Sequence, residues 1–184
     1  EGFDGNICLW DVTTGQQIGE PLSGHSGSVT DITFSPDGSL LASGSDDRTI
    51  LLWDMKTKQQ IGEPLRGHDG PVSSIAIDPN GLILASGGGM VSAPDYNVRL
   101  WDVTTGQQIG EPLSGHTSYL ISIAFSPDGS VLASMSTDRT ILLWDVETGQ
   151  KISEPLMGHT EEVYIVSFSP DGSMLASGGD DGIL

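Results

Sequence analysis

Four histidines are the residues with the greatest potential for chemistry, and each follows a glycine: His25, His68, His116 and His159. They are separated by 43, 48 and 43 residues, so each belongs to a different repeat of the sequence. Zinc ligands must converge to within about 2 Å of the metal, which residues spread one per repeat do not do. A hydrolase triad is a single site, whereas His, Ser and Asp recur here in every repeat. The pattern predicts no catalytic residue, no metal site and no cofactor.

Carboxylates are the other abundant functional group, with 25 acidic residues against 7 basic ones and a net charge of -18. This excess argues against nucleic-acid binding, which needs clustered Lys and Arg, and against binding to an anionic membrane surface. Most of the acidic residues recur at equivalent repeat positions, and none of the loops has the alternating carboxylates of a calcium site. The single cysteine, Cys8, cannot form an internal disulfide. No apolar run reaches the roughly 18–20 residues of a membrane span.

Three motifs recur in register along the chain. Trp-Asp begins at Trp10, Trp53, Trp101 and Trp144, with the same spacings as the histidines. Ser-Pro-Asp-Gly occupies residues 35–38, 127–130 and 169–172, and Asp-Pro-Asn-Gly takes the remaining position at 78–81. Residues 10–25 and 101–116 are identical, which indicates duplication of a unit of two repeats.

The elements that position these residues have the periodicity of strands. In one period, residues 29–34 alternate between apolar and polar, and residues 40–45, 49–53 and 59–65 form three further short runs bounded by turn residues. Pro64 lies in the last run, and a proline is tolerated only in an edge strand. No segment has helical periodicity over ten residues. The sequence predicts an all-β protein of four-stranded antiparallel sheets.

These motifs resemble those of the WD-repeat β-propeller family, and the resemblance covers essentially the whole chain. It implies that each period is one propeller blade, with strands a to d running from the centre to the rim. It also implies a hydrogen-bonded set in each blade, formed by the His of Gly-His, a Ser of strand b, an Asp of the b–c turn and the Trp of strand c. The implied sets are His25, Ser43, Asp47, Trp53; His68, Ser86, Asp95, Trp101; His116, Ser134, Asp138, Trp144; and His159, Ser177, Asp181, Trp10.

Elementary chemistry agrees with such sets. A buried aspartate is tolerable only with charge-assisted donors, each worth about 1.5–3 kcal/mol. A histidine can bridge two partners because one ring nitrogen donates while the other accepts.

The two ends of the chain are expected to be complementary halves of one blade. Expected boundaries are 4–22 for an N-terminal half-blade, 28–65, 71–113 and 119–156 for three blades, and 162–184 for a C-terminal half-blade. Three closures are open: a four-bladed ring in one chain, an eight-bladed ring from two chains, or a piece of a longer array. We favour the two-chain ring, because this family usually forms rings of more than four blades.

A candidate partner-binding face follows from the resemblance, since the d–a and b–c loops of such a propeller emerge together. The residues expected there are Asp46, Met90, Tyr119, Ile121, Glu162, Tyr164 and Asp180. Aromatic residues beside carboxylates suit a basic or mixed peptide. Met90 belongs to a five-residue insertion within residues 87–95, which is either an adaptable contact or tolerated drift at a loop tip. All of these positions could equally be solvated loop residues.

Together these features favour a non-enzymatic scaffold that binds a protein or peptide, but no nucleic acid and no membrane, and that self-associates as two chains. We expect a cytoplasmic, intracellular location. The alternative is a structural or engineered repeat fragment whose only activity is self-assembly.

Overall fold

The computed structural model describes residues 5–181, and in this range the chain consists of strands, turns and loops without a helix. Residue 4 of the expected N-terminal half-blade and residues 182–184 of the C-terminal one lie outside the described range. No helix of residues 5–181 is long and apolar enough to cross a membrane.

Two complete blades have four antiparallel strands each, in the order of the chain. The strands of the first are β3 (Val29–Phe34), β4 (Leu40–Ser45), β5 (Thr49–Asp54) and β6 (Gln59–Arg66). The strands of the second are β7 (Val72–Ile77), β8 (Ile83–Gly88), β9 (Val98–Asp102) and β10 (Gln108–Leu113). Pro64 and Pro112 lie in β6 and β10, the edge strands, where a missing N–H does not interrupt a ladder.

The third blade has three strands, β11 (Leu120–Phe125), β12 (Val131–Ser136) and β13 (Ile141–Asp145). The expected fourth strand is not continuous here: residues 151–156 follow β13 through the isolated bridges Trp144↔Lys151 and Ile141↔Leu156 and a hydrogen bond from the Ile152 N–H to the Leu143 carbonyl. The physical reason is that Leu156 is not packed against apolar side chains of a following blade. Leu156 is 41% exposed, whereas the equivalent Leu65 and Leu113 are 5% and 8% exposed and pack against the next blade.

Two-stranded sheets stand at the two ends of the chain. At the N-terminal end, β1 (Asn6–Ile7) pairs with β2 (Leu22–Ser23). At the C-terminal end, β14 (Val163–Phe168) pairs with β15 (Leu175–Gly179). The first sheet occupies the place of strands c and d in the repeat, and the second that of strands a and b.

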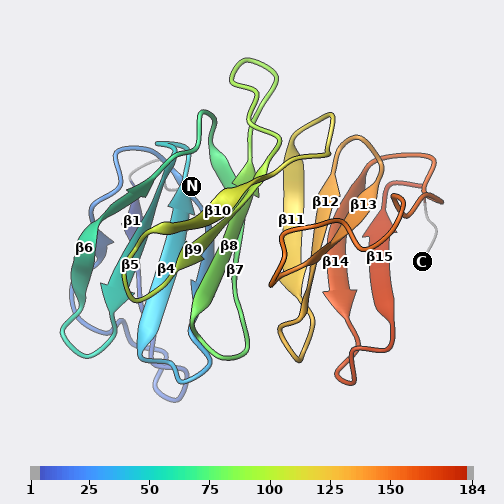
Figure 1. Ribbon diagram of the computed structural model, residues 1–184. Helices are drawn as coiled ribbons and strands as arrows, with labels where there is room; N and C mark the ends of the chain where they lie inside the picture. The colour runs from blue at the N-terminus through green and yellow to red at the C-terminus, as the bar shows by residue number, and fades with distance from the viewer. Residues whose placement is uncertain (1–4, 182–184) are drawn as a thin grey trace.

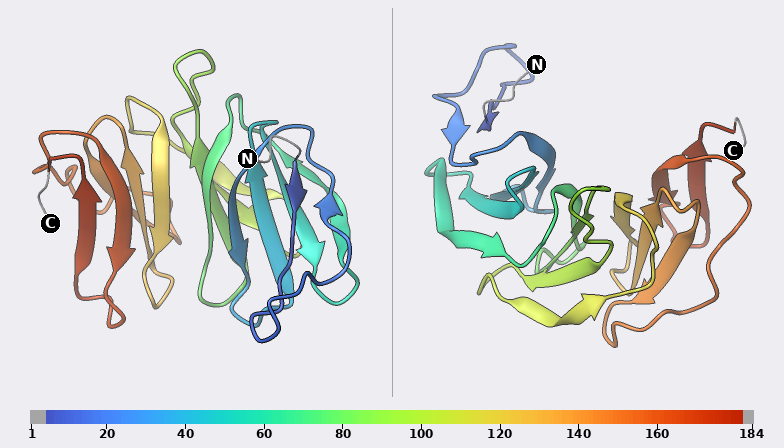
Figure 2. Two further views of the ribbon diagram at one scale, coloured as in Figure 1. Left: turned by 180° about the vertical axis from the view of Figure 1, so that it is seen from behind. Right: turned by 90° about the horizontal axis from the view of Figure 1, so that it is seen from above.

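The blades stand side by side in an open arc (Figures 1 and 2). The first strand of each sheet packs on the first strand of the next, β3 on β7, β7 on β11 and β11 on β14. The view from above in Figure 2 places the N- and C-terminal sheets at opposite ends of this arc. The four-bladed ring in one chain is therefore not the arrangement of this structure.

The apolar cores lie between successive blades rather than inside any one of them. The outer-strand leucine of one blade shares a core with the tryptophan of the next, as for Leu65 with Trp101 and Leu113 with Trp144. A tryptophan with both neighbours present is 2% exposed, as are Trp53, Trp101 and Trp144, but Trp10 at the open end is 60% exposed. Burial of each blade thus depends on the blade beside it.

The Ser-Pro-Asp-Gly turns between strands a and b are held by their aspartates. In the third blade, the carboxylate of Asp128 accepts hydrogen bonds from Ser126 Oγ at 2.6 Å and from the backbone N–H of Ser130 at 3.0 Å. The Asp37 and Asp171 carboxylates accept the equivalent bonds in their turns. Bonds that favour the ionised form, chiefly that from Ser126, lower the pKa of Asp128 to about 2, and the pKa values of Asp37 and Asp171 fall equally.

We expect Asp128→Asn to lower the free energy of unfolding at pH 7, because an amide oxygen replaces only part of the carboxylate's accepting capacity. A lowered native pKa stabilises the fold above pH 4 and loses this effect as the pH falls from about 4 to about 2. The difference between wild type and variant should therefore narrow over that interval in urea titrations. Glu147→Gln, which alters an exposed carboxylate without a hydrogen bond in the described chain, is the control. A constant difference down to pH 2 would contradict this account.

Candidate functional site

A buried serine hydroxyl is the centre of the hydrogen-bonded set in the first complete blade. Trp53 Nε1 donates to Ser43 Oγ at 2.9 Å, and His25 Nε2 lies 2.8 Å from the same hydroxyl. On its other side, His25 Nδ1 lies 3.0 Å from Asp47 Oδ2. Because a carboxylate can only accept, this geometry requires the proton on Nδ1, and the serine then donates to Nε2. Donation therefore runs from the indole through the hydroxyl to the imidazole, and from the imidazole to the carboxylate.

The same arrangement recurs in the next two blades. In the second blade, His68 lies 2.7 Å from both Ser86 and Asp95, and Trp101 donates to Ser86 at 2.7 Å. In the third, His116 lies 2.9 Å from Ser134 and 3.0 Å from Asp138, and Trp144 donates to Ser134 at 2.7 Å.

The fourth set is incomplete within one chain. His159 lies 2.8 Å from Ser177 Oγ and 2.8 Å from Asp181 Oδ2. Trp10, the expected fourth member, lies in the other terminal sheet and makes no hydrogen bond with Ser177 in the described chain. The structure thus brings together three of these four residues.

The aspartates of the sets are kept ionised despite their burial. Burial by itself raises the pKa of Asp138, but hydrogen bonds from His116, Thr140 and the backbone of Thr117 outweigh it and hold the pKa below its usual value. The pKa values of Asp47 and Asp95 are lowered in the same way, against the effect of burial. The donors supplied by each blade therefore stabilise a charge that would otherwise oppose folding.

Some members of these networks were not anticipated from the sequence. Thr49 Oγ1 donates to Asp47 at 2.6 Å, and Thr140 Oγ1 donates to Asp138 at 2.6 Å. The sequence feature that marks these threonines is the recurring Asp-Arg-Thr at residues 47–49 and 138–140. In the second blade, the guanidinium of Arg99 lies 3.8 Å from Asp95, at a position that Leu51 holds in the first blade.

In three of the sets, the serine hydroxyl is not accessible from solvent. Ser43, Ser86 and Ser134 are fully buried, and each hydroxyl is occupied by a histidine and a tryptophan. A nucleophilic serine must instead be accessible to its substrate. Within residues 5–181, no group of three His, Cys, Asp or Glu side chains is placed to hold a metal ion. The sets are organised as structural networks.

The candidate partner-binding residues lie on the face formed by the d–a and b–c loops, at the top of Figure 1. The same backbone hydrogen bond joins the two loops in every unit. In each unit, a backbone N–H of the b–c loop donates to a backbone carbonyl of the d–a loop. The four donor and acceptor pairs are Asp46 and Ser28 at 3.0 Å, Gly89 and Pro71 at 2.8 Å, Thr137 and Tyr119 at 3.1 Å, and Asp180 and Glu162 at 2.9 Å. A fixed backbone frame thus presents side chains that differ from unit to unit.

One part of this face combines an aromatic ring with carboxylates. The Tyr164 hydroxyl donates to Asp180 Oδ2 at 2.7 Å and approaches Glu162 Oε2 at 3.4 Å, and all three residues are exposed. The hydrogen bond to Asp180, together with the neighbouring negative charges, raises the pKa of Tyr164 to about 12. We call Glu162, Tyr164 and Asp180 the acidic sector.

The other expected face residues are spread along the arc. Tyr119 and Ile121 are half-buried at the start of β11, and Asp46 is exposed beyond β4, far along the arc from β15. Met90 lies in the inserted loop, which projects from the top of Figure 1 and is closed by paired backbone bonds between Met90 and Ala93. Met90 is 44% exposed and the adjacent Val91 is 83% exposed.

We expect Ser134→Ala to lower the free energy of unfolding by about 1–3 kcal/mol, because the His116 ring and the Trp144 indole lose their shared buried partner. Chemical denaturation measures this change. Ser153→Ala, a serine on the exposed rim, is the matched control and should change the free energy by less than about 0.5 kcal/mol. Equal effects of the two substitutions would contradict a stabilising role for the set.

Comparison with known sequences identifies the repeat. The family model for the WD domain, G-beta repeat, matches residues 15–54, 58–102, 106–145 and 149–184. The first three matches each end on the aspartate of Trp-Asp: Asp54, Asp102 and Asp145.

Curated relatives match over about one repeat each. A Periodic tryptophan protein 2 homolog of Neurospora crassa is 51% identical over 49 residues, which is 27% of this chain and 5% of that protein. A U5 small nuclear ribonucleoprotein 40 kDa protein of Pongo abelii is 40% identical over 45 residues, 24% of this chain and 12% of that protein. A Eukaryotic translation initiation factor 3 subunit I of Drosophila willistoni is 37% identical over 46 residues, 25% of this chain and 14% of that protein.

The matched stretches thus span a small fraction of the relatives' own lengths. With four family matches over most of its length and the same hydrogen-bonded set in three blades, this chain belongs to the WD-repeat family.

Proposed function

We propose that this chain is a non-enzymatic scaffold that binds a protein or peptide on the face formed by its d–a and b–c loops. Proteins of the WD-repeat family are generally scaffolds of this kind. The observation that carries the proposal is the constant backbone frame of this face, on which the side chains vary from unit to unit. A rigid frame lowers the entropic cost of binding, and variable side chains supply specificity.

The acidic sector supports a basic or mixed peptide as the partner. Glu162 and Asp180 are exposed, and no Lys, Arg or His of residues 5–181 forms an ion pair with either carboxylate. Arg139 lies close by, where Nη1 donates to the carbonyl of Thr160 at 2.9 Å, so the surface is not uniformly negative. Tyr164 adds an amphipathic ring of the kind that anchors peptide partners.

The remaining features of the proposal rest on charge and on the relatives. The net charge of -18 disfavours nucleic acid and anionic membranes as partners. Two relatives, a small nuclear ribonucleoprotein protein and a translation initiation factor subunit, support an intracellular location for this chain.

The scaffold is further proposed to close as an eight-bladed ring of two chains. This proposal is supported by the exposure of an apolar side chain at the N-terminal end of the arc. Trp10 is 60% exposed there, whereas the equivalent Trp53, Trp101 and Trp144 are 2% exposed. Three blades and two complementary half-blades per chain give eight blades in a pair. Within residues 5–181, strand edges and apolar side chains at both ends of the arc have no cover.

We expect a short labelled peptide of alternating lysine and leucine to bind, and its affinity to fall about tenfold when Glu162→Gln is combined with Asp180→Asn. Removal of the two carboxylates eliminates the attraction for the ammonium groups. Fluorescence anisotropy at two salt concentrations measures the change.

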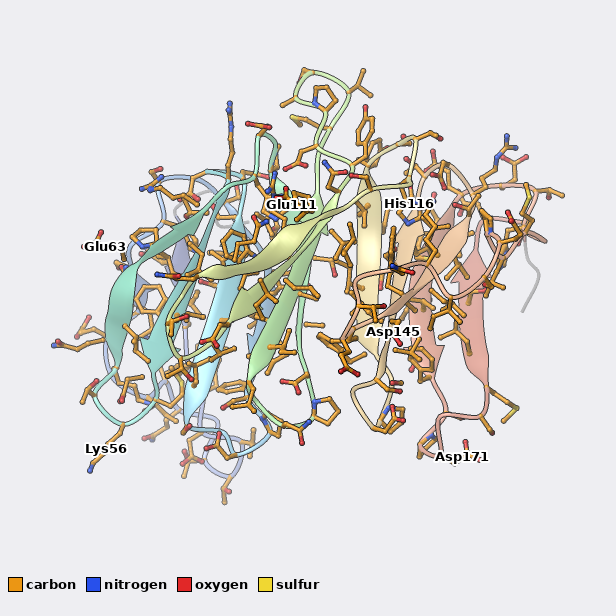
Figure 3. The ribbon with its side chains drawn as sticks, viewed as in Figure 1. Lys56, Glu63, Glu111, His116, Asp145 and Asp171 are labelled. Atoms are coloured by element: carbon orange, nitrogen blue, oxygen red, sulfur yellow. The ribbon has the colours of Figure 1, made fainter. Side chains whose placement is uncertain are left out.

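The control is Glu63→Gln combined with Glu111→Gln, which removes the same charge from the rim positions labelled in Figure 3. An equal loss in the control would show that net charge alone attracts the peptide. Absence of binding at low salt would overturn the proposal and favour the alternative of a chain that only self-assembles.

For the ring, we expect a sedimentation mass about twice the 19.3 kDa of one chain. Trp10→Ala should shift the distribution toward single chains, because it removes the largest apolar side chain of the open end. Val91→Ala, in the exposed inserted loop, is the control and should leave the mass unchanged. A wild-type mass of one chain would contradict closure, and a ladder of larger masses would indicate an open array.

A further inference from the structure

The insertion in the second blade has a defined position between β8 and β9. In the first blade, Asp46, whose backbone N–H donates to the d–a loop, is followed at once by Asp47 of the hydrogen-bonded set. In the second blade, the residues with these two roles are Gly89 and Asp95. The insertion is therefore residues 90–94, which we call the inserted hairpin.

The inserted hairpin is closed by its own backbone. The N–H of Met90 donates to the carbonyl of Ala93 at 3.2 Å, and the N–H of Ala93 donates to the carbonyl of Met90 at 3.0 Å. This pair of bonds leaves Val91 and Ser92 as a two-residue loop at the tip, a tight connection. Val91 is 83% exposed and Met90 is 44% exposed, and the loop projects from the face at the top of Figure 1.

The base of the inserted hairpin packs against the d–a loop without room for a side chain. A Cβ added at Gly70 would collide with the carbonyl oxygen of Ala93, and one added at Gly89 would lie 2.7 Å from the carbonyl oxygen of Asp95. Gly89 also has a φ of +97°, which residues with a side chain rarely adopt. The two glycines are buried and fix the direction in which the hairpin projects.

The end of the inserted hairpin is fixed by a modified hydrogen-bonded set. In the first and third blades a threonine donates to the aspartate at 2.6 Å, but in the second blade Asn97 takes its place, 3.3 Å from Asp95. The guanidinium of Arg99 adds a positive charge 3.8 Å from this carboxylate. The Asp95 side chain is 1% exposed, against 11% for Asp47 and 9% for Asp138. The aspartate next to the insertion is thus the most deeply buried of the three.

This support favours a contact element over tolerated drift. Insertions that are merely tolerated are typical of exposed tips with small or polar residues. Here a valine and a methionine are exposed on a base that is held by close packing and hydrogen bonds. Apolar side chains in water gain free energy only when another surface covers them.

A carboxylate stands beside the inserted hairpin. The backbone N–H of Asp69 donates to Asp95 Oδ2 at 3.0 Å, and the next residue is Gly70, which packs on the hairpin. Asp69 is exposed, and its carboxylate forms no ion pair within residues 5–181. The complement of such a surface is an aliphatic side chain adjacent to a lysine or arginine.

We infer that the inserted hairpin is an apolar anchor, where Val91 and Met90 pack on aliphatic side chains of a bound protein segment and Asp69 pairs with an adjacent basic residue. This inference rests on the proposed function and assigns part of its specificity to the second blade. The acidic sector attracts any basic segment, whereas the inserted hairpin selects segments that also carry aliphatic groups. The net charge of -18 disfavours an anionic lipid surface as the cover for this tip.

Two labelled peptides of equal length and charge test the inference on the full chain, one of alternating lysine and leucine and one of alternating lysine and serine. We expect the leucine peptide to bind about tenfold more tightly, as measured by fluorescence anisotropy. Met90→Ser combined with Val91→Ser should reduce this preference to at most about twofold by weakening only the leucine peptide. Asp69→Asn should weaken both peptides by about the same factor, because both carry lysine.

The matched control is Leu82→Ser combined with Met174→Ser. These side chains are 60% and 68% exposed, but they lie at the a–b turns, at the opposite ends of the strands. The control should leave the preference for leucine unchanged. Deletion of residues 90–94 joins Gly89 to Asp95 as in the other blades, and should keep the fold in urea titrations while the preference is lost.

The outcomes separate this inference from the proposed function. If the leucine peptide binds the hairpin variant as tightly as the wild type, or if the control loses as much affinity, the anchor is overturned and the scaffold remains. Failure of both peptides to bind the wild type overturns the proposed function and the anchor together. Binding to vesicles of zwitterionic phosphatidylcholine that is lost in the hairpin variant would identify a lipid surface as the cover and overturn the protein segment.

Discussion

The structure depends on one constraint, which is that a blade has two faces and buries them only against the blades on either side. The cores lie between sheets, so that the same residue type is buried or exposed according to its neighbours. Three tryptophans of strand c are 2% exposed and the fourth, Trp10, is 60% exposed, although all four precede an aspartate in equivalent sequence. Repeat proteins share this nearest-neighbour dependence, and the ends of a repeat array require special cover. Here Trp10, which has no preceding blade in the described chain, is the tryptophan left exposed.

Within a blade, the polar counterpart of this constraint is the shared serine hydroxyl. Burial of histidine, serine and aspartate together is unfavourable unless each group is paired. The indole, hydroxyl, imidazole and carboxylate satisfy one another in sequence, and further bonds such as those from Thr49 and Thr140 to the aspartates keep the carboxylates ionised. Histidine, serine and aspartate are the residue types of a hydrolase triad, but in these sets they link the loops to the strands by hydrogen bonds. The proposed binding surface is the loop face, where the backbone is constant and the side chains are not.

Much of this fold is predictable from the sequence because it is local and repeated. The strand at residues 40–45 is observed as Leu40–Ser45, and the turn residues mark most of the others. Features that depend on distant neighbours are not predictable in this way. The strand expected before Leu156 is reduced to isolated bridges because the sheet that follows it, β14–β15, has no third strand in the described chain to cover this leucine. The contact of Arg99 with Asp95 arises where a leucine stands in the other blades. At the loop face, the sequence indicates the positions, but only the structure shows that Tyr164, Asp180 and Glu162 are in contact.

The proposed two-chain ring requires the two terminal sheets of this chain to complete one blade between copies. Amide hydrogen exchange along β15 tests this claim most directly, because it reports on the strand edge itself. The account predicts that, in the two-chain species, the amides of Leu175–Gly179 exchange as slowly as those of Leu40–Ser45, which lie between two strands in every state. They should become fast on dilution to single chains. Rapid exchange of β15 in a species of two-chain mass would contradict the account.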